Sequence, residues 1–241
     1  MALTEEGIVY NWGRNYLGQL GTKTTENIVG PSIVGNLFNR KVIEIACSSS
    51  YNVVLCDNHQ IYEWGKRSRN DSRPHPNVES LVEGKLKGKE VISVACSLDA
   101  SFALTSNGCV YSWGANWCGI LGRNHSENGN VDNNDPSEVQ NLTGVFIKKI
   151  VTGRDHVLVL SHDGMVYSWG SNECGHLGHG ILDDGYFTSI PKDVKFLRDD
   201  GRISTKKVID IAAVPVCSTS VAMDENCQIF MWGDCKGMCE M

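Results

Sequence analysis

An acid and a base stand side by side at Asp155-His156, the pair in this 241-residue chain best suited to proton chemistry. Histidine changes charge near neutral pH, and a neighbouring carboxylate raises its pKa. Adjacent residues in a strand point to opposite faces, however, so the two side chains need not meet. We therefore predict a structural histidine, and we keep Asp155 and His156 as candidates for contact with a partner.

Potential metal ligands run from position 174 to 179 in the order Cys-Gly-His-Leu-Gly-His, with two further histidines upstream. Thiolate and imidazole groups are the ligands that zinc prefers. Cys174 and His176, however, stand at loop positions that elsewhere hold Cys118 and Ile120, or Leu17 and Gln19. A metal site is therefore disfavoured, and we expect no cofactor. With no P-loop, nucleophile elbow or paired-carboxylate motif, we also predict that the chain is not an enzyme.

Positive charge gathers between positions 66 and 73, where four of eight residues are basic: Lys66, Arg67, Arg69 and Arg73. Such a run can bind an acidic partner, act as an import signal or contact phosphates. The simpler interpretation is a solvated loop. We take the four side chains as candidates for partner contact.

The overall charge argues against nucleic acid as the partner. The chain has 22 basic and 28 acidic residues, a net charge of −6, whereas duplex binding usually needs an excess of Lys and Arg. No apolar run approaches the length of a membrane span, and the first residues do not resemble a secretory signal. These features predict a soluble protein of the cytoplasm, with the nucleus as the alternative.

An internal repeat sets the spacing of these residues. The dipeptide Trp-Gly occurs five times, with an aromatic residue two positions before each Trp and a β-branched residue three positions before. This alternation is the period-2 pattern of a strand that packs on one side. The structural repeat residues are Trp12, Gly13, Trp64, Gly65, Trp113, Gly114, Trp169, Gly170, Trp232 and Gly233.

Each repeat also carries turn and loop signals. A Gly five residues before Trp12, Trp113 and Trp169 predicts a tight hairpin. At Asn58-His59 and Asn226-Cys227 we expect the Asn to supply most of the turn conformation. Three repeats continue as Trp-Gly-x-Asn-x-x-Gly-x-Leu-Gly, and then as Pro-x-x-Val, which could form a fourth strand.

Repeats of about 50 residues with three or four strands indicate an all-β propeller with one sheet per repeat. We expect one domain over residues 1–241, with repeats around 1–34, 35–81, 82–139, 140–194 and 195–241. The prediction is a partial β-propeller of about four to five blades, each a three- to four-stranded antiparallel sheet. Its open ring would need a partner to cover the exposed sheet faces.

The pattern [Val/Ile]-[Tyr/Phe]-x-Trp-Gly-x-Asn-x-x-Gly-x-Leu-Gly resembles the regulator of chromosome condensation repeat family, whose members form seven-bladed propellers. The resemblance covers essentially the whole chain. Residues 208–213 and 229–237 look most like the last repeats of members that carry a BTB domain after the propeller. In the family a His often recurs at the position of His156 for structural reasons. In its nucleotide-exchange member, residues on the corresponding face contact a small GTPase.

The register also bears on the cysteines. Cys47 and Cys96 lie 17 residues before a repeat Trp, and Cys118 and Cys174 lie five residues after one. Cysteines at equivalent positions are expected to be small buried residues that fill the same gap in each blade.

Two functions remain open on these grounds. The first is a non-catalytic protein-protein interaction scaffold that uses propeller loops. The resemblance implies for it an adaptor role in a ubiquitin-ligase or trafficking complex. The second is a guanine-nucleotide exchange factor or regulator of a small GTPase, which needs no covalent chemistry. Chromatin binding is disfavoured by the negative charge and the missing basic tail.

Overall fold

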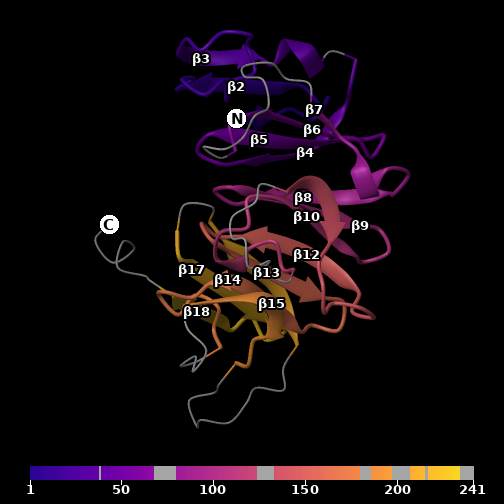
Figure 1. Ribbon diagram of the computed structural model, residues 1–241, viewed down its shortest axis with the longest axis vertical. Helices are drawn as coiled ribbons and strands as arrows, with labels where there is room; N and C mark the ends of the chain where they lie inside the picture. Colours follow the sequence, from indigo (N-terminus) through magenta and orange to yellow (C-terminus); the bar gives the residue numbers. More distant parts are fainter. Residues whose placement is uncertain are drawn as a thin grey trace.

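The chain folds into five antiparallel sheets that follow one another along an arc (Figure 1). This computed structural model describes residues 1–37, 39–67, 80–123, 133–179, 186–196, 207–214 and 217–233. Sheet 1 contains β1 (Ala2–Leu3), β2 (Val9–Gly13) and β3 (Ile28–Ile33). Sheet 2 contains β4 (Val42–Cys47), β5 (Tyr51–Cys56), β6 (Ile61–Gly65) and β7 (Ser80–Val82).

The remaining three sheets repeat the same up-and-down order. Sheet 3 contains β8 (Val91–Cys96), β9 (Ala100–Thr105), β10 (Val110–Gly114) and β11 (Asn133–Glu138). Sheet 4 contains β12 (Ile147–Thr152), β13 (His156–Ser161), β14 (Val166–Ser171) and β15 (Phe187–Asp193). Sheet 5 contains β16 (Val208–Ala213), β17 (Thr219–Asp224) and β18 (Ile229–Gly233). The prediction of a partial, all-β propeller is therefore confirmed.

The helical content of the described residues is three short 3-10 helices: η1 (Gly35–Leu37), η2 (Gly84–Leu86) and η3 (Trp117–Gly119). Among the helices in the described part of the chain, none has the length and apolar composition that a membrane crossing requires.

The first strands of sheets 2 to 5 lie beside one another and define the inside of the arc: β4 contacts β8, β8 contacts β12, and β12 contacts β16. The turns that follow these strands are joined by hydrogen bonds. The Ser48 hydroxyl donates to the Leu98 carbonyl at 3.2 Å. The Leu98 N–H donates to the Arg154 carbonyl at 3.2 Å, and the Arg154 N–H donates to Cys217 at 3.1 Å. The inner rim is thus fixed from sheet to sheet.

The hairpin turns form where the Gly signals predicted them, with left-handed φ values of 85° at Gly7, 79° at Gly108 and 85° at Gly164. In the two repeats without this Gly, the expectation for Asn was wrong. The residue with left-handed φ is His59 at 64° and Cys227 at 62°. Both stand five residues before the repeat Trp, so position in the hairpin, rather than residue type, decides which residue takes this conformation.

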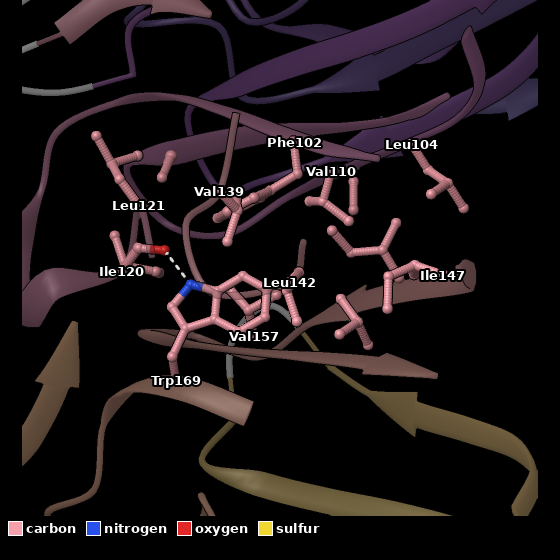
Figure 2. Close-up of a cluster of buried hydrophobic side chains, with 14 residues drawn as sticks. Phe102, Leu104, Val110, Ile120, Leu121, Val139, Leu142, Ile147, Val157 and Trp169 are labelled. Atoms are coloured by element: carbon pink, nitrogen blue, oxygen red, sulfur yellow. Dashed lines mark hydrogen bonds between the residues drawn. The ribbon is translucent and has the colours of Figure 1, made fainter. Parts of the chain in front are cut away.

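Apolar side chains fill the joints between sheets. Figure 2 shows one such cluster, in which Phe102, Leu104 and Val110 of sheet 3 face Ile147, Val157 and Trp169 of sheet 4. Trp169 is fully buried there. Because a strand alternates its side chains, one side of each sheet meets the previous sheet and the other side meets the next.

A tryptophan hydrogen bond lies at the centre of these joints. The indole N–H of Trp169 donates to the Ile120 carbonyl at 2.7 Å (Figure 2). Trp64 and Trp232 donate in the same way, to Gln19 at 3.0 Å and to His176 at 2.9 Å. Each acceptor is the x residue of a Gly-x-Leu-Gly loop in the preceding sheet, at residues 18–21, 119–122 and 175–178.

The loop motif has the composition that this joint requires. The Asn of Trp-Gly-x-Asn accepts the N–H of the loop Leu, as Asn116 does from Leu121 at 3.0 Å. At the last Gly of the loop, Gly122, φ is 65°, and an added Cβ would lie 2.9 Å from the Trp169 indole nitrogen. A side chain there would both strain the backbone and displace the indole.

The cysteines follow the repeat only in part. Cys96 is buried, Cys118 is half-buried, and Cys47 and Cys174 are exposed, so the prediction of burial was wrong for the last two. Cys96 packs in the cluster between sheets 2 and 3. Cys47 is the equivalent residue toward sheet 1, which has three strands in place of four in the described residues.

We expect Trp169→Phe to destabilise the protein by about 2–4 kcal/mol, because it removes the donor to a buried carbonyl and leaves a void. The measurement is urea unfolding followed by circular dichroism. Trp12→Phe is the matched control: Trp12 is 40% exposed, so its substitution should change the free energy of unfolding by less than about 0.5 kcal/mol. Equal losses in the two variants would contradict the role of the joint.

Candidate partner-binding face

One end of the sheets collects two sets of connections. The first is the inner turns, such as 97–99 and 153–155, and the second is the Gly-x-Leu-Gly loops that follow three of the five Trp-Gly dipeptides. Register places them together, because Gly114 pairs with Ala100 and Gly170 pairs with His156. We call this end the Trp-Gly face. The opposite end carries the hairpin turns, and we call it the hairpin face.

Asp155 lies in the inner turn of sheet 4 on the Trp-Gly face. Its backbone carbonyl accepts the Ser171 N–H at 2.8 Å, which ties the turn to the end of β14. Its side chain is 37% exposed, and its carboxylate lies 3.3 Å from the Arg154 guanidinium. Partial burial raises the pKa of Asp155, Arg154 opposes this, and the Glu173 carboxylate adds to the rise.

An aromatic and a second acid accompany Asp155. The pKa of Cys118 is raised, first by burial and then by the carboxylates of Asp155 and Glu173, so these three side chains share one electrostatic neighbourhood. Glu173 is exposed, and Trp117 beside Cys118 is 44% exposed. Helix η3, which contains Trp117, packs against β14 and β15 of the next sheet. The face therefore offers an aromatic side chain, a type enriched in protein interfaces, beside acidic groups that can steer a partner of opposite charge.

His156 does not reach this face. Its side chain is fully buried, its Nε2 lies 2.9 Å from the Ser220 hydroxyl, and its ring lies 4.5 Å from the ring of His176. Burial, and secondarily His176, lowers the pKa of His156 to about 3. As predicted, Asp155 and His156 point to different places and form no catalytic pair. Because His156 lies inside a joint, we no longer regard it as a partner contact.

The candidate basic residues between positions 66 and 73 also differ in their surroundings. Lys66 is half-buried, and Arg69 and Arg73 lie outside the described residues. Arg67 is only 1% exposed, so its expected role as a surface cation is contradicted. Arg67 stands three residues after Trp64, where three other repeats have the inward-pointing Asn of Trp-Gly-x-Asn. Its position in the repeat therefore directs the side chain into the protein.

Arg67 is part of a modified joint between sheets 2 and 3. Glu63, 2% exposed, lies 3.5 Å from the Arg67 guanidinium. The Glu63 carboxylate also accepts the Trp113 indole N–H and the Ser101 hydroxyl, each at 2.7 Å. Arg67 also hydrogen-bonds Asn134 in β11. In the other joints a loop carbonyl accepts the indole N–H, and here the Glu63 carboxylate takes its place. The repeat of Glu63 is the one among the first four that lacks Gly-x-Leu-Gly.

The sequence contained a signal for this substitution. The residue before the repeat Trp is small and polar in three repeats, Asn11, Ser112 and Ser168, and is Glu63 in the repeat whose Asn is replaced by Arg67. Glu63 and Arg67 both differ from the usual residues of the repeat, and they carry opposite charges, which indicates an ion pair between them. The grouping of Trp117 and Glu173 near Asp155 had no such signal, because it joins neighbouring sheets.

The candidate metal ligands do not come together. Within the described ranges there is no group of three or more His, Cys, Asp or Glu side chains placed to hold a metal ion. Cys174 is exposed, whereas His176 is 2% exposed and packs against His156.

Known proteins share both the repeat and the fold. The family model for the regulator of chromosome condensation (RCC1) repeat matches residues 6–55, 107–160 and 163–213. A second RCC1 repeat model matches residues 91–120 and 147–175.

Two curated proteins illustrate the similarity. The Arabidopsis thaliana "RCC1 domain-containing protein RUG3, mitochondrial" is 31% identical over 98% of this chain and 52% of its own length. The human "E3 ubiquitin-protein ligase HERC2" is 35% identical over 97% of this chain but only 5% of its own length. The chain thus spans about half of the first relative and a small part of the second.

Among solved structures, Prp20p from Saccharomyces cerevisiae superimposes with a TM-score of 0.79 and 24% identity. The match covers 97% of this chain and 55% of Prp20p. At this identity the likeness supports the fold alone.

We expect Glu63→Gln to destabilise the protein by about 3–5 kcal/mol, because the buried Arg67 guanidinium would lose its carboxylate. The double variant Glu63→Gln, Arg67→Gln should lose clearly less than the sum of the two single losses, as measured in a double-mutant cycle by urea unfolding. Additive losses would mean that the two side chains do not interact.

Burial of His156 also predicts acid sensitivity. In the unfolded chain the His156 side chain takes up a proton at its ordinary pKa of 6.5. In the folded state burial lowers this pKa to about 3, so His156 stays neutral until the pH falls to that value. Between these values the free energy of unfolding should fall with falling pH, by up to about 1.4 kcal/mol per pH unit from this residue. His156→Asn should flatten the slope by that amount in denaturation at a series of pH values. His162→Asn, on an exposed turn, is the control for loss of a histidine as such. An unchanged slope in His156→Asn would count against the burial argument.

Proposed function

We propose that this chain, which belongs to the regulator of chromosome condensation (RCC1) repeat family, is a non-catalytic scaffold that binds another protein through its Trp-Gly face. The observation that carries the proposal is the neighbourhood of Asp155, Glu173 and Cys118, with the exposed Trp117 beside it. These side chains come from the connections of two sheets whose backbones are fixed by hydrogen bonds. A rigid frame with charged and aromatic side chains suits recognition.

The remaining polar groups support a binding role over a catalytic one. The two constellations that could do chemistry, Glu63 with Arg67 and His156 with Ser220, lie inside joints between sheets. Glu63 and Arg67 pair with each other, and Ser220 donates to the His176 carbonyl at 2.7 Å. Their contacts are those of buried structural groups, which need partners to remain inside the protein.

Regulation of a small GTPase is the second candidate function. The observation in its favour is that Asp155 keeps part of its carboxylate exposed on the Trp-Gly face. The family resemblance implies that this face corresponds to the one with which the nucleotide-exchange member contacts a small GTPase. Prp20p, whose fold this chain shares, is described by its binding to Gsp1p and histones. An exchange factor acts by distorting a nucleotide site, so it fits a face without catalytic groups.

Narrower roles remain proposals as well. An adaptor role in a ubiquitin-ligase or trafficking complex draws support from the similarity to a segment of HERC2, whose name includes a ligase. The closer relation to members that carry a BTB domain rests on residues 208–213 and 229–237 alone. The proposed location is the cytoplasm or nucleus, although RUG3 is named as mitochondrial.

The binding face can be tested with charge reversals. We expect Asp155→Lys and Glu173→Lys each to weaken binding about tenfold, because each replaces an attractive charge with a repulsive one at a partly exposed site. Partners captured by the immobilised wild-type protein would be quantified by mass spectrometry, and unfolding curves would verify the fold of each variant. Asp163→Lys, on the hairpin face with an 89% exposed side chain, is the matched control.

The proposal requires at least one protein that wild type and Asp163→Lys capture and the two face variants do not. If all variants capture the same set, the Trp-Gly face is not the binding surface. In parallel, nucleotide release from a panel of small GTPases would be followed with micromolar protein. Acceleration that Asp155→Lys abolishes would favour the exchange function, and no acceleration would remove it.

A further inference from the structure

A cavity of about 520 Å³ lies on the hairpin face, at the contact between sheets 2 and 3. Its wall is formed by the hairpin turn between β5 and β6, by the segment around helix η2 and by the start of β8. This volume is in the range of sites that hold a small molecule or a few residues of a peptide. The residues of the hairpin turn explain why the space is open.

The hairpin turns of sheets 1, 3 and 4 pack directly against the next sheet. In these turns the residue with left-handed φ is a glycine, and its carbonyl accepts the first N–H of the next sheet, as Gly108 does from Ile147 at 3.1 Å. The same bond forms in sheets 1 and 4, at Gly7 and Gly164. A Cβ on Gly108 would lie 2.8 Å from the Phe146 ring, so this contact leaves no room for a side chain.

Sheet 2 has His59 in place of this glycine, and His59 holds the two sheets apart. Among the described residues, no backbone hydrogen bond joins His59 to Val91, which begins β8. The imidazole makes the contact instead: its Nδ1 lies 2.9 Å from the Val91 carbonyl, and its Nε2 lies 3.9 Å from the Glu90 carboxylate. The imidazole thus separates the turn backbone from β8, and the cavity lies beside it.

The wall of the cavity combines buried apolar side chains with basic ones. Ile61, Leu86 and Val91 are at most 5% exposed and form its inner part. Lys87 is exposed and Lys89 is half-buried. Within the described part of the chain, no acidic side chain forms an ion pair with Lys87. The cavity therefore offers an apolar interior and a cation at its mouth.

The acidic residues near the cavity do not neutralise these lysines. The Glu90 carboxylate lies beside His59 and accepts the Ser106 hydroxyl at 2.8 Å. Between positions 83 and 90 three lysines stand against two glutamates, in a chain whose net charge is −6. The cavity is thus locally basic in an acidic protein, which favours an anionic ligand.

We propose that this cavity, which we call the His59 pocket, binds a short acidic segment of a partner protein. An apolar side chain of the segment would fill the inner part at Leu86 and Val91, and carboxylates on either side of it would pair with Lys87 and Lys89. The pocket lies on the hairpin face, so the inference goes beyond the proposed binding through the Trp-Gly face and does not depend on it.

A phosphate ion or a nucleic acid backbone would use only part of the pocket. Each offers anionic oxygens to the lysines but no apolar group to the inner part formed by Leu86 and Val91. A peptide supplies both kinds of group in adjacent residues, and it is therefore the occupant that we infer.

The test is the fluorescence anisotropy of short labelled peptides, titrated with the full chain at physiological ionic strength. The probe is Glu-Glu-Leu-Glu-Glu. Its matched controls are Gln-Gln-Leu-Gln-Gln, which lacks the charges, and Glu-Glu-Gly-Glu-Glu, which lacks the apolar side chain. We expect the probe to bind at least about tenfold more tightly than either control, because each control loses one part of the contact.

A charge reversal tests the lysine at the mouth of the pocket. Lys87→Glu should weaken binding of the probe at least about tenfold, because it places a repulsive charge beside the peptide carboxylates. Lys195→Glu, at an exposed lysine after β15, is the matched control and should leave the binding unchanged.

Substitutions of His59 test whether this residue opens the pocket. His59→Gly restores the glycine of the other turns, so sheet 3 should close onto the turn and binding of the probe should fall at least about tenfold, with no loss in the free energy of unfolding. His59→Asn keeps a side chain at the contact and tolerates left-handed φ, so it should retain the binding.

Equal binding of the three peptides, full binding by Lys87→Glu or by His59→Gly, or no detectable binding of the probe would each overturn the proposal. Displacement of the probe by inorganic phosphate or duplex DNA as efficiently as by unlabelled probe would also overturn it, because that result identifies a general anion site. Asp155→Lys should bind the probe as the wild type does, which separates this result from the fate of the Trp-Gly face.

Discussion

The joint between successive sheets depends on one hydrogen bond, from a buried indole N–H to the carbonyl of a loop in the preceding sheet. Burying an indole donor without an acceptor is costly, so the loop must present a carbonyl at a fixed place. The glycines of Gly-x-Leu-Gly allow the left-handed conformations of the loop, as Gly122 does, and the Asn of Trp-Gly-x-Asn accepts its inner N–H. The repeat motif thus contains both halves of a joint. One sheet supplies the Trp, and the preceding sheet supplies the Gly-x-Leu-Gly loop that accepts its hydrogen bond.

The joint tolerates replacement of its parts only when the replacement supplies the same acceptor. Between sheets 2 and 3 the carboxylate of Glu63 receives the Trp113 indole, and Arg67 neutralises the buried charge. Between sheets 4 and 5 the indole bond is kept, and His156, His176 and Ser220 add a buried polar cluster beside it. Acidic, basic and imidazole groups of this kind could in principle act in catalysis or metal binding. Here they are buried, and their hydrogen bonds and ion pairs connect neighbouring sheets.

Because the joints bury these polar groups, a binding partner can reach only the surfaces outside the joints. Hydrogen bonds fix the backbone of the inner turns and loops of the Trp-Gly face. The side chains of Asp155, Glu173 and Trp117 are at least partly exposed there and stay available for the proposed contact with a partner.

The repeat, the strands and the hairpins could be predicted from the sequence, because they depend on local spacing: a period-2 pattern around each Trp and a turn residue five positions before it. The sequence also indicated that Asp155 and His156 need not meet, and in the structure Asp155 lies in a turn whereas His156 begins β13. Which polar residues are buried depends instead on contacts between sheets. Arg67 looked like a solvated cation. His156 was expected to be structural but was kept among the candidates for partner contact. Each side chain points into a joint whose other half comes from another sheet, at Trp113 for Arg67 and at Ser220 for His156. Burial depends on that second sheet. The local pattern carries a signal for the pairing of Arg67 with Glu63, but it does not contain the sheet that covers them.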